Sequence, residues 1–115
     1  MSLERIIKTL EGFGLKRLDA EVYIYLAKKG PLKGIDIADV LKIRKRRQLY
    51  SILKALQDKG VVTVSHEQPA LFSAVTFEKA LDLLVEANLE QAKAIEAAKE
   101  ELLSSWRDMN KRDNT

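Results

Sequence analysis

Five basic residues stand within six positions near the middle of this 115-residue chain: Lys42, Arg44, Lys45, Arg46 and Arg47. A guanidinium group can fork onto phosphate oxygens or onto the O6 and N7 acceptors of guanine. Gln48 follows directly, and its amide suits the N6 and N7 edge of adenine. Ser51 adds a hydroxyl one turn later. These residue types in this order predict binding to a polyanion, and the major groove of DNA suits them best.

An amphipathic helix must position these groups. Apolar residues recur at the i, i+3, i+4, i+7 spacing of one helix face: Leu49, Ile52, Leu53 and Leu56. At about 100° per residue, the opposite face holds Arg47, Ser51, Lys54 and Asp58, with Gln48 and Tyr50 on the two flanks. Gly60 suits the end of such a helix. The pattern predicts a recognition helix over residues 44–59. An ordinary helix with a solvated basic face is the alternative.

The elements before this stretch complete a helix-turn-helix. Residues 3–10 show helical spacing with Ser2 as N-cap, and residues 18–29 form a second helix that Gly30-Pro31 ends. A short aliphatic helix over 34–41 then leads through Lys42 and Ile43 into the basic helix. Two helices joined by so few residues, the second of them basic, are typical of a helix-turn-helix. We expect Ile43 to fill the angle between the two helices.

A hairpin follows the predicted recognition helix. Residues 61–65 and 71–75 alternate in the manner of strands, and residues 66–70 link them. A helix-turn-helix followed by a β-hairpin is the winged-helix arrangement. The loop holds His66 and Glu67 but no Lys or Arg, so we expect weak contacts from the wing.

The C-terminal part predicts one long helix. Thr76 is suited to cap it, and no Gly or Pro follows. Its first two turns (Phe77, Ala80, Leu81 and Leu84) are expected to pack on the winged domain. Beyond them a seven-residue repeat gives a coiled-coil seam: Val85, Asn88, Ala92, Ile95, Lys99, Leu102, Trp106 and Met109. We predict that this seam pairs two copies; a helix folded back along its own domain is the alternative.

These elements predict a mainly α fold with a small β-hairpin. Residues 1–76 are expected to form a winged helix-turn-helix DNA-binding domain, 77–112 a dimerisation helix and 113–115 a frayed tail. The charge is divided in the same way. Residues 1–76 carry 14 basic and 8 acidic residues, a net charge of +6, whereas 77–115 carry 6 basic and 9 acidic, a net charge of −3. A basic first part indicates a polyanionic partner.

Other function classes have little support in the composition. The chain has no cysteine and one histidine, and no phosphate-binding glycine motif or nucleophile–base pattern occurs. We therefore expect no enzyme activity, no cofactor and no metal, and the sequence implies no small-molecule ligand. No run of 18 apolar residues and no signal-peptide pattern is present, which predicts a cytoplasmic, nucleoid-associated protein that does not engage a membrane.

From Phe13 to Leu84 the chain resembles the N-terminal winged-helix domain of the TrmB family of archaeal transcription regulators. The similarity runs through Gly14-Leu15, Ala20-Glu21-Val22-Tyr23, Gly30-Pro31, Ile37-Ala38, the stretch from Leu49 to Val62, and Gln68 to Val75. The family usually enters its recognition helix through a proline, where this chain has Arg44, and its wing usually carries basic residues. Longer members carry a C-terminal sugar-binding domain. This chain ends in a helix instead, so we expect a short form without that domain, and the resemblance does not imply a sugar ligand here.

The leading hypothesis is a homodimeric DNA-binding transcription regulator that reads the major groove with residues 44–59. Three residues would read base edges: Arg47, Gln48 and Ser51. Six would contact phosphates: Lys42, Arg44, Lys45, Arg46, Tyr50 and Lys54. Roles without DNA contact remain open for some of them. Lys45 and Arg46 could simply be solvated, Gln48 could cap or hydrogen-bond within the start of the helix, and Tyr50 could pack on the edge of the core.

Two further function classes remain open. One is a sequence-neutral chromatin protein that uses the same basic face without reading bases. The other is a winged-helix subunit of the transcription machinery whose basic helix meets an acidic protein surface. RNA is a weaker match, because the strands lack exposed aromatic pairs that could stack on bases.

Overall fold

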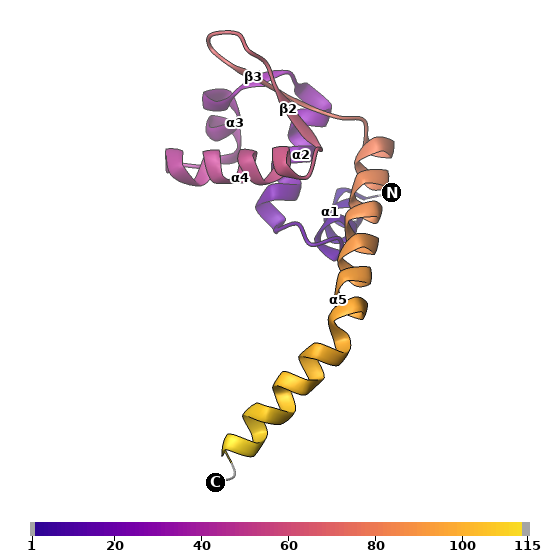
Figure 1. The fold of residues 1–115 in the computed structure, drawn as a ribbon. Helices are drawn as coiled ribbons and strands as arrows, with labels where there is room; N and C mark the ends of the chain where they lie inside the picture. Colours follow the sequence, from indigo (N-terminus) through magenta and orange to yellow (C-terminus); the bar gives the residue numbers. More distant parts are fainter. Residues whose placement is uncertain (1, 114–115) are drawn as a thin grey trace. The chain divides into compact units, whose positions relative to one another are not determined.

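The computed structural model describes residues 2–113 and divides the chain into two compact units, residues 1–85 and 86–115 (Figure 1). The described residues form five helices and three short strands. In chain order these are α1 (Leu3–Gly12), α2 (Arg17–Lys29), β1 (Leu32–Lys33), α3 (Gly34–Leu41), α4 (Arg46–Asp58), β2 (Val62–Val64), β3 (Leu71–Ala74) and α5 (Phe77–Asp113). The predicted winged helix-turn-helix and long C-terminal helix are confirmed.

An ion-pair network links the first two helices at the surface. Ser2 caps α1 as expected, because the Arg5 amide donates to its Oγ at 3.2 Å. Arg17 donates to the two carboxylate oxygens of Glu4 at 2.8 and 3.0 Å, and its Nε donates to Glu21 at 3.2 Å. The network is exposed, so its contribution to stability is modest.

The same network sets a pH dependence. The hydrogen bond from Arg17, with its positive charge, holds the pKa of Glu4 below its usual value, and Glu4 in turn raises the pKa of Arg17. Because the Glu4 pKa is lower in the folded chain than in the unfolded chain, the ion pair stabilises the fold above the ordinary glutamate pKa. That stabilisation is lost as the pH falls through the lowered folded pKa.

The strands form one antiparallel sheet in the order β1-β3-β2. The predicted hairpin is confirmed, with Val62 opposite Ala74 and Val64 opposite Phe72. The strand β1 was not predicted. It is only two residues long and lies between Pro31 and Gly34, so it is too short to show an alternating pattern. Its pairing with β3 places Leu32 opposite Phe72 and ties the entry of α3 to the wing.

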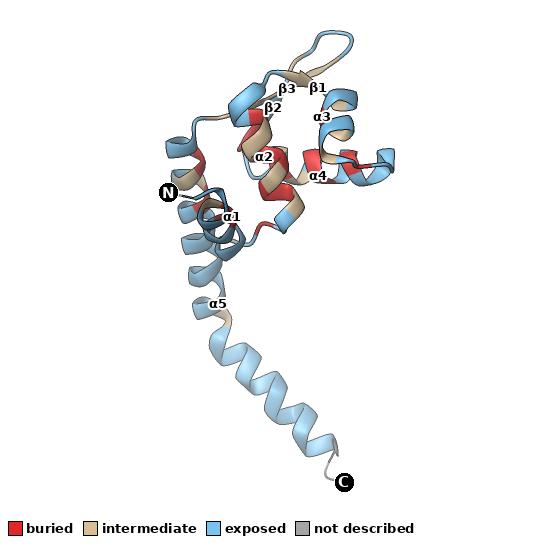
Figure 2. Ribbon diagram, turned by 180° about the vertical axis from the view of Figure 1, so that it is seen from behind, coloured by how far each residue is buried: buried red, intermediate tan, exposed pale blue. Residues whose placement is uncertain are grey.

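One aliphatic core lies under α2, α4 and the sheet, and Figure 2 shows the buried stretches on α2 and α4. Tyr23 is buried within it and donates its hydroxyl to the Val75 carbonyl at 2.6 Å. Burial raises the pKa of the Tyr23 phenol, which keeps this donor protonated. Ala80 and Leu84 of α5 are buried in the same core, as expected, whereas Leu81 is half-buried and Phe77 is 38% exposed.

The long helix begins where the sequence predicted. The Lys79 amide donates to Thr76 Oγ1 at 3.2 Å, so Thr76 caps α5. Between residues 86 and 112 every side chain is exposed within the single chain except Ala98, which is half-buried. Of the expected frayed tail, residues 114 and 115 lie outside the described part of the chain, and α5 ends at Asp113. No helix in the described range is both long and apolar enough to cross a membrane.

We predict that Tyr23→Phe lowers the free energy of unfolding by about 1–2 kcal/mol, because it leaves the half-buried Val75 carbonyl without its phenolic donor. Urea unfolding followed by circular dichroism measures the change. Tyr25→Phe is the matched control, since the Tyr25 hydroxyl makes no described hydrogen bond, and it should leave stability nearly unchanged. Equal losses in the two variants would contradict the assigned role.

Candidate nucleic-acid interface

A tight turn positions the basic residues. The helix α3 ends at Leu41, and Lys42 adopts a left-handed conformation with φ 57° and ψ 40°. The Ile43 amide then donates to the Ala38 carbonyl at 2.9 Å, the bond that closes a Schellman-type helix end. Ile43 is buried, so it fills the angle between α3 and α4 as expected.

The predicted start of the recognition helix was wrong by two residues. Residues 44–59 were expected to be helical, but α4 spans Arg46–Asp58, with Lys45 in an extended conformation before it and Lys59 as its C-cap. The left-handed Lys42 and the inward turn at Ile43 use up the first positions of the basic stretch. Lys42, Arg44 and Lys45 therefore lie in the turn rather than on the helix.

The apolar face of α4 holds the helix in place as the sequence predicted. Leu49, Ile52, Leu53 and Leu56 are all buried. Gly60 takes the positive φ of 80° that ends the helix, and the Val61 amide donates back to the Leu56 carbonyl at 3.1 Å. The six predicted contact residues on the helix are all exposed: Arg46, Arg47, Gln48, Tyr50, Ser51 and Lys54.

The backbone at the start of α4 adds positive potential to that of its basic side chains. Its N-cap, Lys45, makes no side-chain capping bond, and no acidic residue stands in the first turn. The first amides of a helix have no intrahelical acceptor, and the macrodipole adds positive potential there. Arg46 and Arg47 share the same turn. This end of α4 is therefore suited to an anion such as a phosphate group.

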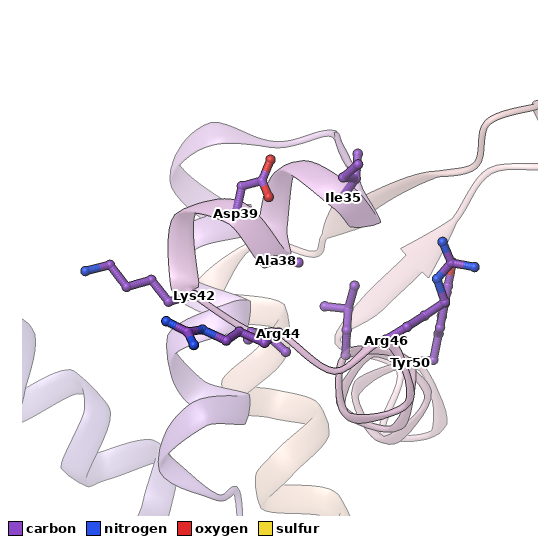
Figure 3. Close-up of a pocket in the computed structure, with 9 residues that line it drawn as sticks. Ile35, Ala38, Asp39, Lys42, Arg44, Arg46 and Tyr50 are labelled. Atoms are coloured by element: carbon purple, nitrogen blue, oxygen red, sulfur yellow. The ribbon is translucent and has the colours of Figure 1, made fainter.

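A hollow of about 670 Å³ lies between α3 and α4 (Figure 3). Lys42, Arg44 and Arg46 line it from the turn and the helix start, and Tyr50, which is 52% exposed, lines it from α4. In Figure 3, Arg46 and Tyr50 lie side by side on one flank of α4, and Lys42 and Arg44 extend on the other side of the hollow. Four of the six predicted phosphate contacts are in this way brought to one surface.

The helix α3 completes the hollow with Ala38 and with two exposed residues that sequence reasoning missed. Ile35, at 67% exposed, and Asp39 both line it (Figure 3). Residues 34–41 were interpreted only as a scaffold helix. Ile35 and Asp39 are four residues apart and so share a face that does not include the buried Ile37. That spacing was the available signal, but it does not reveal which element this face would meet.

The predicted base-reading residues do not share the hollow. Gln48 and Ser51 line a separate groove of about 310 Å³ on the other flank of α4, beside Lys16, Asp19 and Lys59. Arg47 lines neither cavity. Lys54 lies 3.9 Å from Asp58 in an exposed i,i+4 pair, which is too weakly held to keep Lys54 from another anion. The outer face of α4 thus presents polar groups between two flanking cavities.

The wing closes without basic residues. The Ser65 amide donates to the Leu71 carbonyl and the Leu71 amide donates to Ser65 Oγ, both at 2.9 Å. Residues 66–69 at the tip, which include His66 and Glu67, are exposed. In the range 2–113, no group of three or more His, Asp or Glu side chains is arranged to hold a metal ion.

Comparisons with known proteins place these features among transcription regulators. The family described as "Sugar-specific transcriptional regulator TrmB" matches residues 10–78. The HTH-type sugar sensing transcriptional regulator TrmBL1 of Pyrococcus furiosus is 31% identical over 99 residues, which are 86% of this chain and 29% of that protein. The chain therefore spans less than a third of this relative's length.

Solved structures show the same architecture. TrmBL2, described as an archaeal chromatin protein with a novel mode of DNA binding, is 27% identical with a TM-score of 0.71, over 90% of this chain and 42% of that one. A Staphylococcus aureus MepR–DNA complex is similar in fold, at 21% identity and a TM-score of 0.53, over 85% of this chain and 86% of that one.

The turn geometry yields a stability prediction. Lys42→Gly should raise the free energy of unfolding by up to about 1 kcal/mol, because glycine adopts the left-handed conformation without the steric cost that a side chain carries. Thermal unfolding at fixed ionic strength measures it. Lys45→Gly removes the same charge at an extended position and should give no gain. A gain of the same size in both variants would indicate a charge effect instead.

Proposed function

Since the chain belongs to the TrmB family of transcriptional regulators, we propose that it binds double-stranded DNA as a homodimer and reads the major groove with α4. One observation carries the proposal. The uncapped start of α4 is exposed beside four basic residues of the turn and first helical position, while the opposite face of the helix is buried. A helix anchored by one face can place its other face in the major groove while the packing of the core stays intact.

The two kinds of contact follow from position. The exposed polar groups of the turn and hollow are suited to phosphates, because flexible cations and a hydroxyl donor can follow the backbone without reading sequence. The basic residues assigned to this role are Lys42, Arg44, Lys45 and Arg46, with Lys54 further along α4, and the Tyr50 hydroxyl is assigned to it as a neutral donor. Arg47, Gln48 and Ser51 present guanidinium, amide and hydroxyl groups from the exposed part of α4. These three are assigned to base edges.

The homodimer rests on α5. Its outer part exposes large apolar side chains in a single chain, including Ile95, Leu102, Trp106 (60% exposed) and Met109. The proposed seam also contains Val85, Asn88, Ala92 and Lys99. Two copies of a winged unit present two recognition helices, as a DNA site with two half-sites requires.

A sequence-neutral chromatin protein is the second candidate, because TrmBL2 is described as a chromatin protein. The same basic hollow would then bind backbone alone. Either function implies association with the nucleoid. Selection of bound duplexes from a random pool separates the two: enrichment of a motif supports the regulator, and a flat outcome supports the chromatin protein.

The division of labour on α4 is testable. Arg47→Ala should cost about 1–3 kcal/mol on the preferred duplex and relax selection at one base pair. Lys54→Ala should weaken all duplexes alike and reduce the slope of log affinity against log salt concentration. Fluorescence anisotropy over a salt series measures both. If Arg47→Ala keeps the wild-type motif and affinity, α4 is not the reading element.

The carboxylate in the hollow gives a prediction of opposite sign. Asp39→Asn should strengthen duplex binding several-fold at low salt, because it removes the one negative charge that lines the basic hollow. The gain should shrink as salt rises. Asp36→Asn, on the same helix but outside the hollow, is the matched control for net charge. Equal gains in both variants would mean that the hollow does not hold a phosphate.

A further inference from the structure

The seam of α5 has an uneven distribution of side-chain size. Its first half carries Val85, Asn88, Ala92 and Ile95, and its second half carries Lys99, Leu102, Trp106 and Met109. All eight are exposed in the single chain. This inference rests on the proposed homodimer. We propose that two copies pair their α5 helices in an antiparallel arrangement centred on Ala97. The half of each seam with smaller side chains then meets the half with larger side chains in the other copy.

The register follows from the heptad spacing. In an antiparallel pair, the first apolar position of one heptad meets the fourth position of the partner. Centring on Ala97 sets Val85 against the partner's Met109 and Asn88 against the partner's Trp106. The next layers set Ala92 against the partner's Leu102 and Ile95 against the partner's Lys99. Every seam residue then has a counterpart, and three of the four kinds of layer combine a smaller side chain with a larger one.

A parallel pair would pack the same residues poorly. Identical seam positions meet in that arrangement, so Ala92 would face another Ala92 and leave a gap. Trp106 would face Trp106 and overfill its layer. Lys99 would face Lys99, and two ammonium groups would repel each other in a partly desolvated seam. The sequence disfavours this arrangement at three of its eight layers.

The residues beside the seam favour the same antiparallel register. Leu89 and Leu103 follow seam positions and are exposed at 57% and 37%. Centring on Ala97 brings Leu89 beside the partner's Leu103, so both leucines cover one edge of the seam. A shift by one heptad in either direction separates them. On the same edge the Glu96 carboxylates of the two copies meet near the two-fold axis, and each also lies near the partner's Lys99, whose ammonium group can offset their repulsion.

The other edge of the seam is uncharged, and it carries small residues at and beyond its centre. Gln91, Ala98 and Ser105 precede seam positions, and Ala98 of each copy would meet at the two-fold axis. Small side chains at this point let two helices approach closely. The charge on this part of the chain, −3 over residues 77–115, is carried mostly on positions away from the seam, so it does not oppose pairing.

Cysteine pairs test the arrangement, because the chain has no cysteine of its own. Ala92→Cys and Leu102→Cys are prepared separately in the full chain, then mixed, allowed to exchange subunits and oxidised. A disulfide requires Cα atoms within about 7 Å, so only residues of one layer can join. The antiparallel pair predicts a cross-linked dimer in the mixture and none in either variant alone. Val85→Cys mixed with Met109→Cys repeats the test at the ends, where less packing is lost.

Controls keep the outcomes distinct. Ala97→Cys lies on the outward face of α5 and should not cross-link at the rate of the seam pairs. Cross-linking of Ala97→Cys at that rate would show that the disulfides form by random collision. Cross-linking of each variant with itself would overturn the proposal in favour of a parallel pair. A dimer by solution mass with no cross-link in any mixture would overturn the register. A monomer by solution mass for the unmodified chain would instead contradict the proposed homodimer, whatever the duplex binding.

Discussion

The burial of one face of α4 is the interaction on which the rest of this protein depends. Leu49, Ile52, Leu53 and Leu56 pack into the core beneath α2 and the sheet, and each buried aliphatic side chain contributes about 1.5–3 kcal/mol. This anchoring fixes the rotation of α4, and the rotation decides which side chains face outward. Ile43 fixes the angle to α3 in the same way. The polar side chains assigned to DNA contact project from a helix whose position is fixed by its buried apolar face. Their geometry therefore depends on the packing of that face.

The electrostatics of the interface oppose the stability of the element that carries it. A helix start usually gains from a capping oxygen or an acidic first turn. The start of α4 has neither and adds Arg46 and Arg47 instead. Its free amides and basic side chains together form a site that a phosphate would complete. Asp39 moderates this positive charge within the hollow, and in the proposed complex that balance would limit backbone binding at any sequence and leave room for base reading to matter.

The outer part of α5 presents the opposite situation, an element without a core of its own. Most of the stability of a helix in a protein comes from packing its apolar face rather than from helix propensity. Ile95, Leu102, Trp106 and Met109 remain exposed in the single chain, so their burial requires another surface. The proposed antiparallel seam supplies it from a second copy and uses Asn88 and Lys99 to fix register. Pairing and folding of this unit would then be one process, coupled to the concentration of the chain.

The sequence by itself determined what is local. The 3.6-residue period of α4, the alternation of the hairpin, the cap at Thr76 and the absence of helix breakers in α5 each depend on near neighbours, and each was predicted. The family resemblance was also readable from short residue motifs within these elements. Only the tertiary structure decided the rest. The strand β1 exists because β3 lies beside it, and α4 begins at Arg46 because Ile43 turns into the core. Gln48 and Ser51 line one groove, whereas Arg46 and Tyr50 line another. The residues that face each flank of α4 come from other parts of the chain, so the periodicity of α4 cannot predict which groove a side chain lines.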